Sequence, residues 1–112
     1  MARLFALIAK DRLVDAAASQ EMRDLLSGAE LNRSPGTTGL GSFIEGALHD
    51  AGRSYDAVYS KIGIGDDNRL HDAGIVQRAI VGGKSRYVVV ALGSDNNFAP
   101  LSKVFVDIDT AL

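Results

Sequence analysis

The sequence predicts an α+β fold in which helices pack against a three-stranded antiparallel sheet. Apolar residues recur every three or four positions before residue 50 and again after residue 100, which indicates amphipathic helices. Between residues 55 and 92 the pattern changes to alternation, interrupted by short turns rich in glycine, which is typical of strands joined as hairpins. The predicted order is α-α-α-β-β-β-α in a single domain over residues 1–112.

Two helices open the chain. Apolar residues at helical spacing predict the first over residues 2–12, and we expect it to be buried in the fold rather than to act as a signal peptide. Asp15 stands at the N-cap of a second helix over residues 16–27, because its carboxylate can accept hydrogen bonds from the free amides of the first turn. The residues of this helix that we expect to face inward are Met22, Leu25 and Leu26.

A loop and a short helix follow. Residues 29–41 contain three glycines and a proline, which predicts a loop, and the absence of a following Gly-Lys-Ser/Thr excludes a phosphate-binding P-loop. Ser42 and Glu45 have the spacing of a capping box, so we expect a helix over residues 43–50 that Gly52 ends.

Three strands make up the predicted sheet. Alternation predicts the first strand over residues 55–64, and a turn at residues 65–68 leads into the second over residues 70–81. Residues 82–85 have the composition of a hairpin loop. The third strand, residues 86–92, is the most apolar of the three, which favours a central or twice-covered position.

The chain closes with a predicted helix over residues 100–111. Its apolar residues repeat at intervals of three and four, and Pro100 stands in the first turn, where a helix tolerates proline. The β-branched residues in this segment lower its helix propensity. The helical part at residues 1–50, the sheet at residues 55–92 and this last helix complete the predicted domain.

Composition excludes several classes of function. The net charge is −2 without a basic stripe, so we expect no nucleic-acid partner, and no apolar run approaches the length of about 20 residues that spans a membrane. The absence of cysteine removes disulfides, thiolate metal sites and cysteine nucleophiles. His49 and His71 lack the spacing of a paired metal motif, so we expect neither a metal nor another cofactor.

Several segments of the chain, taken in order, resemble parts of one known family. They are Ala2 to Val14, Ser19 to Met22, Ser60-Lys61-Ile62-Gly63, His71 to Val76 and Arg86 to Leu92. The first two resemble late helices, the third the Lys-Thr/Ser-Gly strand, and the last two the final strands of serine β-lactamases and penicillin-binding proteins, in particular class A β-lactamases. The resemblance covers nearly all of this chain and less than half of the family's domain.

The resemblance implies the C-terminal portion of a serine hydrolase that acts on β-lactam or acyl-peptide amide bonds, in a family typically periplasmic or extracellular. It assigns substrate binding to Lys61, Ile62 and Gly63. Lys61 would place a positive charge beside a substrate carboxylate, and Gly63 would allow close approach of the backbone. Ile62 replaces the family's hydroxyl residue and cannot donate a hydrogen bond. A solvated strand position is an equally weighted interpretation of Lys61.

The chain lacks the rest of the family's catalytic machinery. No serine is followed three positions later by lysine, so we expect no catalytic residue here and no activity from the isolated chain. Ser60 precedes Lys61 by one position, which directs it to the opposite face of a strand. Ser94-Asp95-Asn96 matches the family's Ser-Asp-Asn in letters but follows the third strand, so we interpret it as a polar turn.

Two further interpretations remain. The first is a non-enzymatic module that binds a partner through its sheet edge or through the loop at residues 29–41. The strands that the family adds to this sheet are not in the chain, which predicts an open edge that pairs with a second copy or with a missing N-terminal portion. The second is an unrelated enzyme whose site is assembled from residues distant in the sequence, and no set of residues in the sequence supports it.

Overall fold

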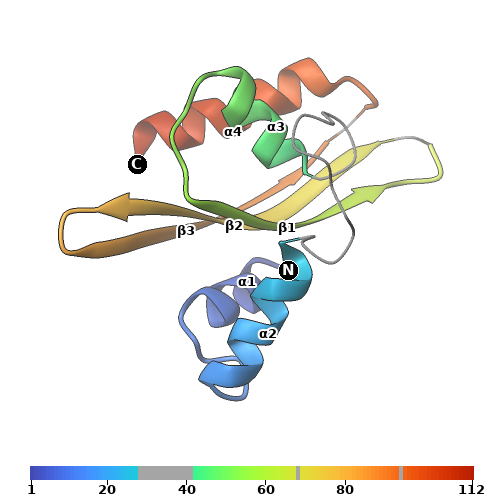
Figure 1. Ribbon diagram of the computed structural model, residues 1–112. Coiled ribbons are helices and arrows are strands. Elements are labelled where there is room, and N and C mark those ends of the chain that lie inside the picture. The colour runs from blue at the N-terminus through green and yellow to red at the C-terminus, as the bar shows by residue number, and fades with distance from the viewer. Residues whose placement is uncertain (28–41, 68, 94) are drawn as a thin grey trace.

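The predicted α+β fold is confirmed by a computed structural model, which describes residues 1–27, 42–67, 69–93 and 95–112 (Figure 1). The elements follow the predicted order. They are α1 (Ala2–Ala9), α2 (Ala16–Leu26), α3 (Phe43–Asp50), β1 (Ala57–Ile64), β2 (Leu70–Ile80), β3 (Gly83–Leu92) and α4 (Phe98–Ala111).

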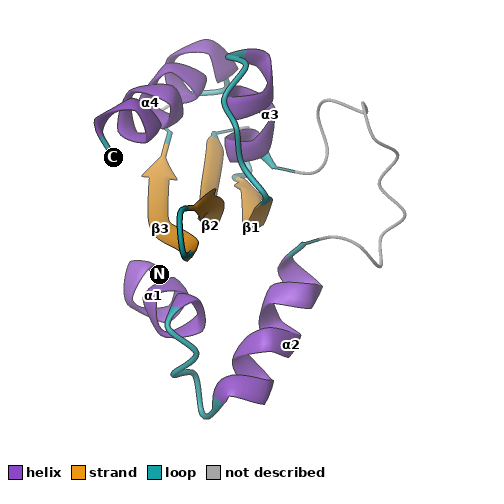
Figure 2. Ribbon diagram, turned by 60° about the vertical axis from the view of Figure 1, so that its left-hand side comes forward, coloured by secondary structure: helices purple, strands orange, loops and turns teal. Residues whose placement is uncertain are grey.

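The sheet lies between two layers of helices. Figure 2 shows α3 and α4 on one face and α1 and α2 on the other. Both strand pairs are antiparallel and the spatial order is β1-β2-β3, so β2 is central. The third strand is therefore not central, but it is covered twice: Val89 belongs to the core under α3 and α4, and Val88 and Val90 pack against the core under α1 and α2. Two short hairpin connections make spatial order follow chain order, and the strand that is buried over residues 72–77 is β2.

Strand alternation divides the buried residues between two cores. Val58 and Val76 point to α3 and α4, whereas Ala73 and Ile75 point to α1 and α2. The buried members of the first core are Ile44, Ala47, Leu48, Val58, Val76, Val89, Leu101 and Phe105. Those of the second are Phe5, Ile8, Ala73 and Ile75. The second core has fewer buried members than the first.

The first helix ends earlier than predicted. α1 stops at Ala9, because the backbone turns left-handed at Asp11 with φ 57°. The Asp15 cap is confirmed, since its carboxylate accepts a hydrogen bond from the Ala18 amide at 2.8 Å. The inward position of Leu25 was wrong: this side chain is 57% exposed, and Arg23 of the same helix is buried instead.

The third helix has the predicted bounds. The Ser42 hydroxyl accepts a hydrogen bond from the Glu45 amide at 3.1 Å, and the chain leaves α3 through Gly52 with φ 66°. The predicted loop at residues 29–41 lies outside the described residues.

The second hairpin is tighter than predicted. β2 ends at Ile80 and β3 begins at Gly83, because Lys84 and Ser85 pair with Ala79 and Arg78 rather than forming a loop. Gly82 turns the chain with φ 86°. α4 begins at Phe98, two residues before the prediction, with the Asn97 side chain capping the Ala99 amide. No helix in the described part of the chain is long and apolar enough to cross a membrane.

Candidate functional site

The residues that the resemblance would assign to substrate binding lie on an edge strand. Among the described residues β1 pairs only with β2, so its outer edge keeps free amides and carbonyls. Lys61 is exposed on this strand, and its Nζ donates a hydrogen bond to the adjacent carbonyl of Ile62 at 2.9 Å. The ammonium group therefore lies at the protein surface without an acidic partner among the described side chains.

Ser60 is turned away from Lys61. It is only 4% exposed, and its Cβ lies on the α3 face of the sheet, opposite Gly74 of β2. Its hydroxyl is buried and has no hydrogen-bond partner among the described residues. Burial between sheet and helix denies this serine contact with a substrate at the outer edge of β1.

Ile62 lies on the same face as Ser60 and pairs with Asp72 on β2. Asp72 is 1% exposed, and its Oδ2 accepts hydrogen bonds from the Ile44 amide at 3.0 Å and the Ser42 hydroxyl at 3.1 Å. Burial raises the pKa of Asp72, although these donors act against the rise. The carboxylate holds the start of α3 against the strand pair that carries Lys61.

Gly63 brings His71 into the site. The two residues are paired across β1 and β2, and a Cβ on Gly63 would lie 3.7 Å from the His71 Cβ. His71 is partly buried, and its Nδ1 lacks a hydrogen-bond partner in the part of the chain that the structure describes. The sequence places His71 at the start of a strand and gives it no metal-binding partner, but it does not place this side chain beside Gly63. The tight turn that pairs Ile64 with Leu70 is the signal that places it beside Gly63.

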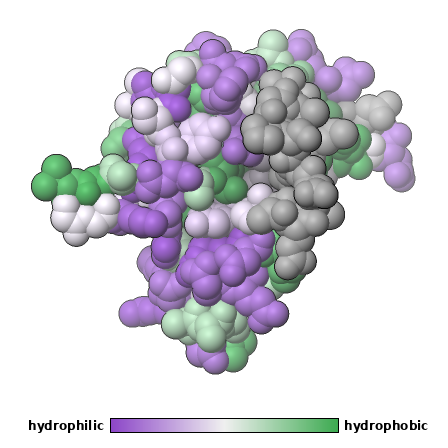
Figure 3. Space-filling model, in the orientation of Figure 1, coloured by the Kyte–Doolittle hydropathy of each residue, from purple (hydrophilic) through white to green (hydrophobic). Residues whose placement is uncertain are grey.

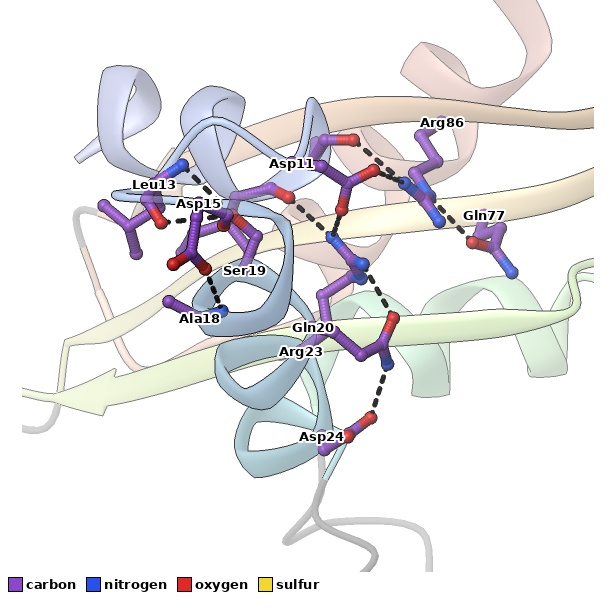
Figure 4. A network of polar contacts seen from close by, with 12 residues as sticks. Asp11, Leu13, Asp15, Ala18, Ser19, Gln20, Arg23, Asp24, Gln77 and Arg86 are labelled. Atoms are coloured by element: carbon purple, nitrogen blue, oxygen red, sulfur yellow. Dashed lines mark hydrogen bonds and ion pairs between the residues drawn. The ribbon is translucent and has the colours of Figure 1, made fainter.

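A buried arginine holds the α1–α2 layer together. The Arg23 guanidinium donates to the Ile8 carbonyl at 2.7 Å and contacts the Asp11 carboxylate at 2.6 Å (Figure 4). The hydrogen bond from Arg23 lowers the pKa of Asp11, against a smaller opposing effect of burial. This contact explains why the chain turns at Asp11 instead of continuing α1.

A second arginine joins that layer to the sheet. Arg86 of β3 donates to the Gln77 side chain at 2.8 Å and to the Ala9 carbonyl at 3.0 Å (Figure 4). The two arginines together fix α1 and α2 over the face of the sheet to which Lys61 and His71 belong.

The remaining polar candidates form no site. The Asp95 carboxylate accepts a hydrogen bond from the Asn97 amide at 2.9 Å, as expected for a polar turn, while Ser94 lies outside the described residues. No three histidine or acidic side chains of the described residues gather in a way that could hold a metal ion. Comparisons of the chain with protein-family profiles, with curated proteins and with solved structures find no match.

Proposed function

We propose that this chain is the C-terminal portion of a β-lactamase-like serine hydrolase domain, and that β1 forms one wall of its substrate cleft. The observation that carries the proposal is the position of Lys61 and Gly63 on a free edge strand, beside His71. The proposal also rests on the resemblance of the ordered segments around this strand.

An edge strand suits an extended, amide-containing substrate. Its outward amides and carbonyls can pair with a substrate backbone, as in β-strand addition. The Lys61 ammonium can donate charge-assisted hydrogen bonds to a substrate carboxylate. Ile62 offers no hydroxyl and faces the α3 side with Ser60, so the proposed carboxylate contact depends on Lys61 alone.

The chain by itself supplies binding groups and no nucleophile. Ser60 is buried on the far face, and no serine in the sequence has a lysine three residues later. We therefore expect the isolated chain to bind a β-lactam weakly and reversibly, without forming an acyl-enzyme.

An NMR titration of the 112-residue chain with benzylpenicillin tests this proposal. We expect saturable shifts of the Lys61, Gly63 and His71 amides, lost in Lys61→Ala and kept in Lys84→Ala, which removes an exposed lysine from β3. Intact mass should show no covalent adduct. Shifts that survive in Lys61→Ala, or acylation at a single serine, would contradict the proposed role of β1.

One observation favours a second function, a non-enzymatic interaction module. Among the described residues β3 also pairs on one side only, and the β2–β3 hairpin ends in Ile80 and Val81, which are 54% and 104% exposed. Figure 3 shows apolar surface at the projecting end of this hairpin, in the orientation of Figure 1. Such an edge recruits a strand from a second copy of the chain.

Light scattering after size exclusion tests the edge. We expect the chain to self-associate as its concentration rises, and Val81→Asp to shift it toward monomer. A folded monomer at high concentration would contradict strand pairing at the free edge of β3. The mass of the native gene product separates the two functions, because a longer product favours the hydrolase and a product of 112 residues favours the module.

A further inference from the structure

A concave site lies at the start of β1, away from Lys61. It is a pocket of about 430 Å³ that opens where the α3–β1 connection meets β2 and α4. Its charged lining residues are Arg53, Asp56, Arg78 and Asp109. The pocket is separate from the Lys61 edge, because Arg78 projects from the α3–α4 face of the sheet and Lys61 belongs to the opposite face.

A buried carboxylate organises the pocket. Asp109 of α4 is 2% exposed, and its Oδ2 accepts a hydrogen bond from Arg53 Nε at 2.6 Å. Its Oδ1 accepts hydrogen bonds from Arg78 Nη2 and from the Tyr87 hydroxyl, the latter at 2.6 Å. The guanidinium of Arg78 also lies 5.4 Å from the centre of the Tyr87 ring. Asp109 thus holds both arginines in fixed positions.

The two arginines exceed what this carboxylate can neutralise. Two guanidinium groups face one buried carboxylate, and the exposed Asp56 carboxylate balances the second positive charge of the lining, so the arginines offer the pocket N–H donors rather than a net charge. The side chains of Arg53 and Arg78 are 35% and 26% exposed, so part of each reaches the pocket. Fixed guanidinium forks match the planar or tetrahedral oxygens of an oxyanion.

One residue that lines the pocket, Asp56, carries a negative charge that repels an anion. Asp56 is exposed and directly precedes β1. Its backbone amide donates to the Gln77 carbonyl at 2.8 Å, which anchors the main chain without using the carboxylate. This carboxylate weakens the attraction of the arginines without filling the pocket, and it provides a charge that can be removed with little effect on the fold.

We propose that this pocket binds a small oxyanion, a carboxylate or a phosphate group, between Arg53 and Arg78. Asp109 acts as a positioning residue that orients both guanidinium groups. The negative charge of Asp56 weakens the binding of the oxyanion. The inference is independent of the proposed hydrolase function, because it uses no residue of the Lys61 edge.

NMR titrations of the full chain with inorganic phosphate and with acetate, at constant ionic strength, test the proposal. We expect saturable shifts of the Arg53, Ser54 and Arg78 amides. Arg53→Gln should weaken binding about tenfold, as expected for the loss of charge-assisted hydrogen bonds. Asp56→Asn should tighten it about threefold by removing a nearby like charge. The anion that saturates at the lower concentration identifies the oxygen geometry that the pocket prefers.

The matched control is Lys84→Gln, which removes an exposed positive charge from β3 and should leave both affinities unchanged. Linear shifts without saturation, or an equal loss of affinity in Lys84→Gln, would overturn the proposal. Asp56→Asn decides the question if Arg53→Gln unfolds the chain, since unchanged or weaker binding in Asp56→Asn would also reject an oxyanion site.

Discussion

The Asp72 carboxylate of β2 accepts a hydrogen bond from the Ile44 amide at 3.0 Å, joining the sheet to the first turn of a helix 28 residues earlier in the chain. The first amides of a helix have no partner within the helix. α3 therefore receives two caps, one from its own Ser42 and one from the neighbouring strand. This contact ties the α3 layer to the strand pair that carries Lys61 and His71.

Replacing Asp72 by alanine should lower the free energy of unfolding by about 1–3 kcal/mol, because the buried Ile44 amide then lacks its acceptor. Asp72→Asn keeps a carbonyl oxygen and should lose less. Urea unfolding at neutral pH measures both variants, with Asp107→Asn on the exposed face of α4 as control. Equal losses in the alanine and asparagine variants would show that the acceptor is unimportant.

Asp72 should also make stability depend on pH. Its pKa is raised in the fold, so the folded chain binds the proton more tightly than the unfolded chain, where the ordinary value is 3.8. The resulting stabilisation is complete below 3.8 and is lost as the pH rises through the folded pKa. We expect the stability of wild type relative to Asp72→Asn to fall as the pH rises above 3.8. Urea titrations between acid and neutral pH check this, and a relative stability that increases with pH would reverse the sign.

Asp11 should act in the opposite direction and in another pH range. Its pKa is lowered by the hydrogen bond from Arg23, so its contribution is present above the ordinary value of 3.8 and is lost as the pH falls below it. Asp11→Asn should remove this acid-side loss while leaving the Asp72 effect unchanged. The same urea titrations, extended to lower pH, separate the two carboxyl groups.

Arg23→Leu should lower the free energy of unfolding by about 2–4 kcal/mol, because it removes a buried cation that serves the Ile8 carbonyl and Asp11. Arg12→Leu, at an exposed position nearby, should change it by less than about 0.5 kcal/mol. Chemical denaturation compares the two variants. Similar losses in both would mean that the buried network contributes no more than a surface charge.

Gly74 and Gly63 provide a matched pair on the strands of the candidate site. A Cβ at Gly74 would lie 2.7 Å from the Ser60 Cβ and 2.8 Å from the Tyr59 carbonyl oxygen, whereas at Gly63 the nearest atom is 3.7 Å away. Gly74→Ala should therefore destabilise the chain by about 1–3 kcal/mol through overpacking, and Gly63→Ala should be nearly neutral. Thermal unfolding of both variants is the measurement. A large loss of stability in Gly63→Ala would contradict the open space that these distances indicate.

The candidate site was only partly predictable. Lys61, Ile62 and Gly63 came from a resemblance, and strand alternation alone assigns Ser60 and Lys61 to opposite faces. His71 and the Arg53–Arg78 pocket were missed, because they depend on pairing register and on contacts between residues as distant as Arg53 and Asp109. Such contacts leave no periodic signal in a single sequence.

The sequence by itself determined the α+β class, the element order and the caps at Asp15 and Ser42, because periodicity and capping are local properties of the chain. Tertiary structure alone decided how deeply each strand is buried: β2 lies between two strands and under helices on both faces, and it is buried over residues 72–77. It also decided where α1 ends, because Arg23 reaches back from α2 to hold Asp11. Tertiary structure also brought Arg53 and Arg78, from separate segments, to the Asp109 carboxylate. A buried carboxylate is costly unless it is paired, and the partners come from the segments that happen to surround it.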